Sequence, residues 1–157
     1  MSPDFHDDDS LDITRKKVFD ALGSGCAFIC PCCGQHVQCY RRKLNSGQAR
    51  SLIWMWKAGG TEYIHLPTTI PLRSREEGKL RYWGLVEELQ EKRPDGGRAG
   101  WWRLTRLGEE FVRRQVSVAS HIWTYADRCL GLDRTSTITI IEALGKQFNY
   151  DELMAGE

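Results

Sequence analysis

The chain has 157 residues, of which 41% are apolar and 27% are charged, and its net charge is +1. This length and balance favour one ordinary folded domain and exclude both a second large domain and wholesale disorder. The longest apolar run, SLIWMW at residues 51 to 56, is far shorter than the roughly 20 residues that cross a bilayer. The acidic start, MSPDFHDDDS, is unlike a secretory signal. We therefore expect a cytoplasmic protein with no membrane partner.

Charge is unevenly distributed along the chain. Residues 1 to 12 hold five aspartates and no Lys or Arg, so a total of +1 leaves +6 for the remainder. We expect residues 1 to 11 to form an acidic mobile tail. A basic body is typical of proteins that bind a polyanion, although solvated surface cations give the same pattern.

The first structured region is expected over residues 12 to 44, as a helix followed by a hairpin. Ser10 or Asp12 can cap a short helix that ends at Gly23, and its apolar residues recur at roughly helical spacing: Ile13, Val18, Phe19 and Leu22. Two short strands around a tight turn follow over residues 26 to 40.

Five of the six cysteines lie in that second stretch, CAFICPCCGQHVQCY. Cys30 and Cys33 have the two-residue spacing with which one turn brings two thiolates onto a tetrahedral ion, and Pro31 and Gly34 suit such a turn. Persistent disulfides are disfavoured inside cells, so metal is the preferred interpretation. The turn resembles the zinc knuckle that makes half of a zinc-ribbon site. No Asp or Glu lies in residues 26 to 43, which indicates a structural rather than a catalytic zinc.

The second Cys-x-x-Cys pair of a zinc ribbon is absent, so the other ligands must come from elsewhere. The first choice for a complete set is Cys26, Cys30, Cys33 and Cys39. His36 is the next candidate, ahead of three more distant residues, His65, His121 and Cys129. A dithiol redox couple is the main rival, although no thioredoxin-like βαβ pattern surrounds the turn. Cysteines outside the pair, such as Cys32, could also be small buried residues.

The clearest amphipathic helix begins at Asn45 or Ser46 and ends at Gly59 and Gly60. Its expected buried face consists of Ala49, Leu52, Ile53 and Trp56. A short strand, TEYIHL, follows. The next segment, SREEGKLRYWG, predicts a polar helix with acidic residues early and basic residues late, which is the order that a helix dipole favours.

The strands LVEELQEK and WWRLT flank the turn PDGGRAG and predict a hairpin. Trp101 and Trp102 are adjacent in the second strand, so they face opposite sides and only one can enter the core. Thr105 can cap the following helix, whose expected inward residues are Leu107, Phe111 and Val112.

The order of these elements over residues 45 to 115 resembles the winged helix-turn-helix of MarR-like bacterial regulators. The resemblance rests on Tyr82-Trp83-Gly84-Leu85-Val86 and on Trp102-Arg103-Leu104-Thr105-x-x-Gly108-x-x-Phe111. It implies that the protein binds double-stranded DNA and regulates transcription, with the polar helix in the major groove and the hairpin as a wing. Together with the basic run after the knuckle, the expected DNA contacts are Arg73, Ser74, Arg75, Lys79, Arg81, Arg98, Arg103, Arg41, Arg42 and Lys43.

Residues 116 to 157 predict a last hairpin, VSVASHIWTY and RCLGL, and a helix that begins near Ser136 or Thr137 and packs on the core. The expected fold class is therefore α+β, with a winged-helix core between an N-terminal zinc-knuckle hairpin and a C-terminal hairpin plus helix. As a whole, the chain is similar to small phage and prophage proteins that join a CPxCG knuckle to a winged helix.

Two other classes of function are open at the level of sequence. A protein-interaction module that binds host or phage machinery fits the near-neutral total charge, the acidic tail and the six tryptophans. An enzyme is not expected, because no Ser-His-Asp, phosphate-loop or paired-carboxylate arrangement is recognisable. Most tryptophans are expected in core or wing packing, with base stacking as the alternative role.

Overall fold

The computed structural model describes residues 3 to 23, 27 to 30, 32 to 69, 76 to 90, 100 to 126 and 128 to 156. These residues form an α+β fold with small antiparallel sheets, in agreement with the expected class. They divide into two compact units, one of Met1–Arg42 with Trp123–Gly131 and one of Lys43–Ile122 with Leu132–Glu157. Within the described parts of the chain, no helix is both long and apolar enough to span a membrane.

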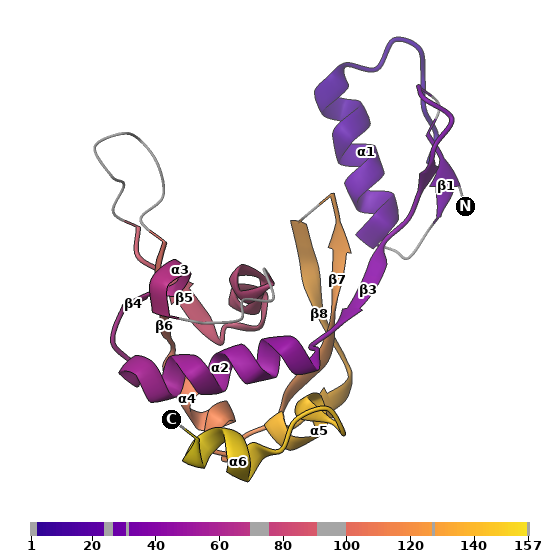
Figure 1. The fold of residues 1–157 in the computed structure, drawn as a ribbon. Helices are drawn as coiled ribbons and strands as arrows, with labels where there is room; N and C mark the ends of the chain where they lie inside the picture. The colour runs from indigo at the N-terminus through magenta and orange to yellow at the C-terminus, as the bar shows by residue number, and fades with distance from the viewer. Residues whose placement is uncertain are drawn as a thin grey trace. The chain divides into compact units, whose positions relative to one another are not determined.

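The first unit is built around one helix and a very short hairpin (Figure 1). Helix α1, Leu11–Gly23, begins after Ser10, whose hydroxyl accepts a hydrogen bond from the amide of Ile13 at 3.3 Å. Strands β1, Phe28–Ile29, and β2, His36–Val37, pair antiparallel. The buried side chains of this unit form one small cluster of Leu22, Phe28 and Val37.

The acidic N-terminal segment contacts this unit at two points. The ring of Phe5 lies 5.8 Å from that of Phe28. The ammonium of Lys17 lies 2.5 Å from a carboxylate oxygen of Asp9 and donates to the carbonyl of Asp4 at 2.8 Å. The hydrogen bond from Lys17 holds the pKa of Asp9 below its ordinary value. The segment is thus joined to α1 by charge and to β1 by packing.

A three-stranded sheet has the strand order β3-β7-β8, with β3 at Tyr40–Lys43, β7 at Val118–Tyr125 and β8 at Arg128–Ile138. The predicted last hairpin is therefore confirmed. Its second strand is longer than predicted, and it occupies the residues at which the final helix was expected to begin. That helix, α5, spans only Ile140–Leu144 and is followed by α6, Tyr150–Ala155. The prediction of a start near Ser136 or Thr137 was wrong because Thr139 caps α5 instead, in a capping box with Glu142.

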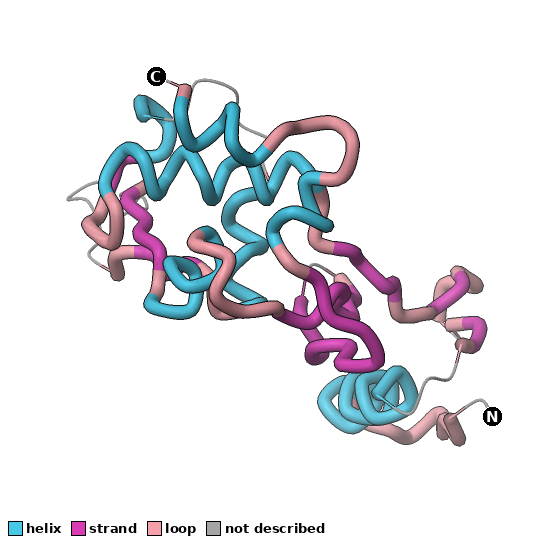
Figure 2. The backbone as a smooth tube through the Cα atoms, turned by 90° about the horizontal axis from the view of Figure 1, so that it is seen from below, coloured by secondary structure: helices cyan, strands magenta, loops and turns pink. Residues whose placement is uncertain are grey.

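Helix α2, Ser46–Gly59, is the centre of the second unit, and its predicted bounds are confirmed. Asn45 and Gln48 form a capping box at its start, and Gly60 ends it with a φ of 59°. Its buried face includes Ala49, Leu52 and Ile53 as expected, but Met55 is buried where Trp56 was predicted. Figure 1 shows α2 with α5 and α6 on one side and a sheet on the other, and it contacts all of them. In Figure 2 the helices of this unit lie against one another.

That sheet has the strand order β4-β6-β5, with β4 at Ile64–His65, β5 at Val86–Glu88 and β6 at Trp101–Leu104. The two strands of the predicted wing hairpin pair as expected, since Val86 lies opposite Leu104. Trp102 is buried and Trp101 is 40% exposed, so one of the two adjacent tryptophans enters the core, as predicted. A single turn, α3 at Leu66–Thr69, directly follows β4.

The polar segment before the hairpin is helical as predicted, and its described part forms a 3-10 helix, η1, at Glu77–Trp83. Its first expected residues, Arg73, Ser74 and Arg75, lie outside the described residues. Three residues per turn put positions i and i+3 on one face, and Glu77, Leu80 and Trp83 are indeed the buried ones. The three buried residues therefore follow the period of a 3-10 helix. Gly84 then ends the segment in the left-handed region, with φ at 75°.

Helix α4, Arg106–Val112, begins at Thr105, whose hydroxyl accepts a hydrogen bond from the amide of Gly108 at 3.1 Å. The predicted cap is therefore confirmed. Phe111 and Val112 are fully buried, whereas Leu107 is 37% exposed, so its predicted inward position was wrong. Gly108 occupies that inward position instead and lies directly against the backbone of Leu85.

Candidate metal-binding turn and nucleic-acid interface

The cysteine turn of the first unit is a tight backbone loop between β1 and β2. The amide of Cys30 donates to the carbonyl of Gln35 at 2.8 Å, and the amide of Gly34 donates to the carbonyl of Cys30 at 2.9 Å. Gly34 has a φ of 73°, the left-handed conformation that glycine adopts without strain. The role predicted for this glycine is therefore confirmed, although Pro31 lies outside the described residues.

The sulfur of Cys30 sits in an environment that favours a thiolate. Hydrogen bonds from the backbone amide of Cys33, and then from that of Cys32, hold its pKa below the ordinary value of a thiol. A cysteine binds zinc as the thiolate, and amide donors around its sulfur stabilise that form. The environment of the Cys30 sulfur is therefore compatible with the ligand role predicted for it.

The other half of that site is not assembled in the described part of the chain. Cys39 packs against the apolar cluster of the first unit, and its thiol donates to the carbonyl of Leu22 at 3.3 Å. Burial raises the pKa of Cys39, which favours the neutral thiol. Cys26 lies outside the described residues, and within them no three His, Cys, Asp or Glu side chains are grouped as metal ligands. The four-cysteine zinc site stays a prediction.

Two predicted DNA contacts on η1 already have partners within the chain. The ammonium of Lys79 lies 3.1 Å from a carboxylate oxygen of Glu76. Arg81 is exposed, and its guanidinium carbon lies 5.1 Å from the ring centre of Tyr82, to whose hydroxyl it donates a hydrogen bond at 3.3 Å. Arg81 is therefore held at the surface, whereas the charge of Lys79 is partly neutralised.

In the hairpin, Arg103 of β6 pairs with Glu87, which lies opposite it on β5. Its guanidinium carbon also lies 4.6 Å from the ring centre of Tyr63. The hydrogen bond to Glu87 raises the pKa of Arg103, so this side chain stays charged. Arg98, the other predicted wing contact, lies outside the described residues.

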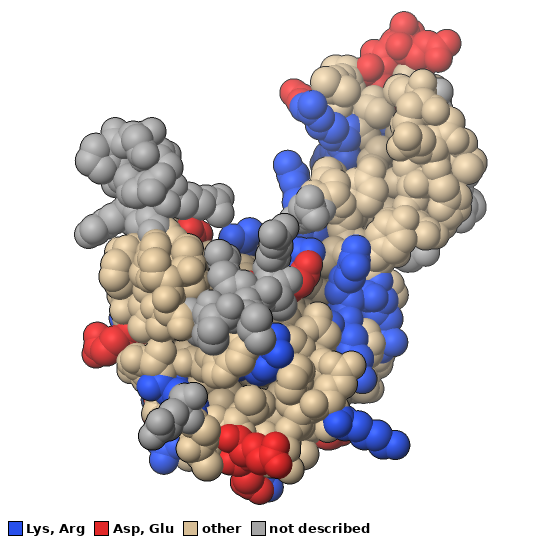
Figure 3. Space-filling view, viewed as in Figure 1, with Lys and Arg blue, Asp and Glu red and all other residues tan. Residues whose placement is uncertain are grey.

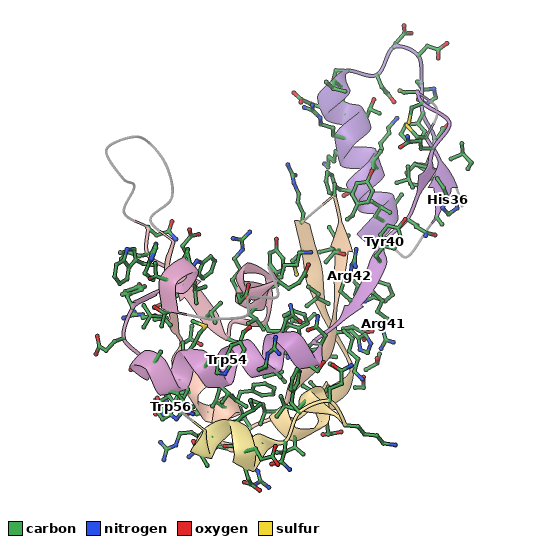
Figure 4. The ribbon with its side chains drawn as sticks, in the orientation of Figure 1. His36, Tyr40, Arg41, Arg42, Trp54 and Trp56 are labelled. Carbon is green, nitrogen blue, oxygen red and sulfur yellow. The ribbon has the colours of Figure 1, made fainter. Side chains whose placement is uncertain are left out.

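The remaining predicted contacts lie on β3, where Arg41, Arg42 and Lys43 are all exposed. Figure 3 shows Lys and Arg side chains gathered over this strand. In Figure 4, Arg41 and Arg42 leave β3 on opposite sides, as consecutive residues of a strand must. This basic run lies on a strand and the cations of η1 lie on a helix, so the DNA contacts predicted from the sequence do not all come from one helix.

The tryptophans differ in exposure: some are packed in the interior, and others are partly exposed at the surface. Trp83 and Trp102 are buried. Trp54 is also packed, because the guanidinium carbon of Arg50 lies 4.6 Å from its ring centre and 4.6 Å from that of Phe148. Trp101 and Trp123 are 40% and 39% exposed. Beside Trp101 lies His65, with 5.3 Å between the ring centres (Figure 4 shows the labelled α2 tryptophans for comparison).

Sequence reasoning did not find the pair of His65 and Trp101. The available signal was the alternation of residue types in two strands, because Tyr63 and His65, like Trp101 and Arg103, are two residues apart and share a face. The alternation alone does not give the register of β4 against β6, which places His65 opposite Trp101.

No protein-family model, curated protein or solved structure matches this chain.

Proposed function

We propose that the protein is a zinc-stabilised winged-helix protein that binds double-stranded DNA and regulates transcription in a phage or other mobile element. The observation that carries the proposal is the strand order β4-β6-β5, in which a strand before η1 and both hairpin strands form one sheet. Gly84 and Leu85 connect η1 directly to that sheet, and the amide of Leu85 donates to the carbonyl of Leu80 at 3.3 Å. The helical segment and the hairpin are therefore directly connected, which supports the proposal.

The charges of this body support a phosphate backbone as partner. Arg81 is exposed on η1 and oriented by Tyr82, and Arg103 is oriented on β6 by Glu87 and Tyr63. An oriented guanidinium loses little entropy when it binds a phosphate. Phosphate contacts of this kind supply affinity and fix position, whereas base contacts supply specificity.

Zinc has a structural role in this proposal. It would be held by the thiolates of Cys30 and Cys33 with two further ligands, for which Cys26 and Cys39 remain our first choice. Bound metal would hold together a hairpin that has only two residues in each strand and thereby fix the basic strand that follows it.

The experiment is a titration of a labelled duplex, followed by fluorescence anisotropy at several salt concentrations. We expect affinity to fall steeply with salt, because each phosphate contact releases counterions. Arg81→Glu should weaken binding roughly tenfold at low salt and make the salt dependence shallower.

The control for this titration is Arg106→Glu. Arg106 is an exposed cation on α4 that pairs with Glu110, and its replacement should have a much smaller effect. Absence of binding at low salt, or equal effects of both substitutions, would contradict the proposal.

A protein-interaction module is the second candidate. It is favoured by the pairing of Lys79 with Glu76, which partly neutralises a cation that DNA would otherwise engage. A protein partner retained in equal amount after nuclease treatment of a bacterial lysate, combined with a failed duplex titration, would favour this function.

A further inference from the structure

One face of the sheet β4-β6-β5 belongs to the core and the other does not. Ile64 and Trp102 are paired across β4 and β6, and both are 8% exposed. The neighbouring pair, His65 and Trp101, points to the opposite side, because successive side chains of a strand alternate. We call the residues on that side, Tyr63, His65, Trp101 and Arg103, the outer sheet face.

The aromatic half of the outer sheet face is held rigidly. A ring nitrogen of His65 lies 2.9 Å from the hydroxyl of Thr68, and the hydroxyl in turn donates to the carbonyl of His65 at 3.3 Å. Trp101 therefore has a fixed neighbour at 45° to its own ring, while 40% of its surface stays exposed.

The polar half of this face is an arginine with unused donors. The Nε of Arg103 donates to Glu87, and its guanidinium lies over the ring of Tyr63. Within the described part of the chain, its two terminal amino groups have no hydrogen-bond partner. A guanidinium has five N–H donors, so the two terminal groups can still bind an anion such as a phosphate.

Arg103 and Trp101 are two residues apart on one strand, so they are separated by about 7 Å on the same face. This separation is within the span of one nucleotide from its phosphate to its base. The carboxylates of Glu87 and Glu62 both act on Arg103 from within the chain, so a bound phosphate would share this guanidinium with them.

We propose that the outer sheet face binds an unpaired nucleotide, with its base stacked on Trp101 and its phosphate bound by Arg103. An aromatic side chain accepts any base because every base has a π face, and a basic group beside it tracks the backbone. The inference rests on the proposed nucleic-acid function and extends it from the duplex to its unpaired strand ends.

The test compares two labelled DNAs of the same sequence, a blunt duplex and a duplex with a single-stranded tail, by fluorescence anisotropy. The wild-type protein should bind the tailed duplex more tightly. Trp101→Leu should remove that preference, a loss of between about 5-fold and about 100-fold in affinity for the tailed DNA. Its affinity for the blunt duplex should not change, and Trp101→Phe should retain most of the preference.

Trp123→Leu is the matched control, because Trp123 is as exposed as Trp101 and lies in the first unit. It should leave both affinities unchanged.

Equal wild-type affinities for blunt and tailed DNA would overturn the inference and leave duplex binding intact. The inference would also be overturned if Trp101→Leu kept the preference for tailed DNA, or if both tryptophan variants lost it. Binding of neither DNA would overturn the proposed function together with the inference. A protein partner displaced by Trp101→Leu while the preference persists would assign this face to protein docking instead.

Discussion

At the scale of single residues, the features that sequence patterns predicted well are those with local causes. At the caps Asn45 and Thr105, the side-chain oxygen accepts a hydrogen bond from an amide three residues later, that of Gln48 and Gly108 respectively. Such contacts need no knowledge of the tertiary fold. The burial of Met55 could not be predicted in the same way, because it depends on which helices pack against α2.

Gly108 offers the sharpest test at this scale. A Cβ built on it would lie 2.0 Å from the carbonyl oxygen of Leu85, which is backbone and cannot rotate away. We expect Gly108→Ala to lower the free energy of unfolding by about 3 kcal/mol, because α4 must shift from the hairpin. Urea denaturation followed by circular dichroism measures the change through the midpoint.

Gly78→Ala is the control for this substitution. The nearest atoms to a Cβ at Gly78 belong to Trp102 at 3.7 Å, an ordinary contact distance. We expect its free energy of unfolding to change by less than about 1 kcal/mol. Similar losses in the two variants would mean that the close approach of Gly108 to Leu85 is not what requires glycine there.

At the scale of elements, the sequence predicted which segments form helices and strands better than it predicted their kind and length. The hairpin of β5 and β6 was predicted from alternation and turn residues. The 3-10 form of η1 was not, because it follows from burial of Glu77 between elements, where the hydroxyl of Ser51 donates to its carboxylate at 3.2 Å. The outer sheet face was not predicted either, because it depends on the register between β4 and β6, which are far apart in the sequence.

The cysteine hairpin carries the prediction that belongs to this scale. We expect about one zinc per purified chain, the stoichiometry of a four-ligand site, and we expect Cys30→Ser and Cys33→Ser each to abolish stoichiometric binding. Elemental analysis combined with native mass spectrometry measures the metal content. Cys32→Ser, which changes an exposed cysteine outside the predicted ligand set, is the control and should retain the ion. A metal-free wild type would refute the structural zinc.

At the scale of the whole molecule, the chain contains two compact units with separate buried clusters. Phe28 is 4% exposed in the first and Phe111 is fully buried in the second. Local clusters of this kind can open independently, with different free energies. The sequence predicted a boundary after the cysteine hairpin, but it contained no sign that residues 123 to 131 group with that hairpin.

We expect Phe28→Ala and Phe111→Ala to destabilise different parts of the chain, each locally by about 3 to 5 kcal/mol. Hydrogen exchange followed by mass spectrometry should show faster exchange of α1 in Phe28→Ala and faster exchange of α2 in Phe111→Ala. If both variants accelerated exchange in both helices to the same extent, the two units would open together and the prediction would be wrong.

The indole N–H of Trp83 donates to the carbonyl of Ala119 at 2.7 Å, and both residues are buried. The acceptor therefore lies beyond the last residue that the winged-helix pattern requires. A chain that ended at residue 115 would contain the predicted winged-helix segment but would lose both this acceptor and β7, the strand that supplies it.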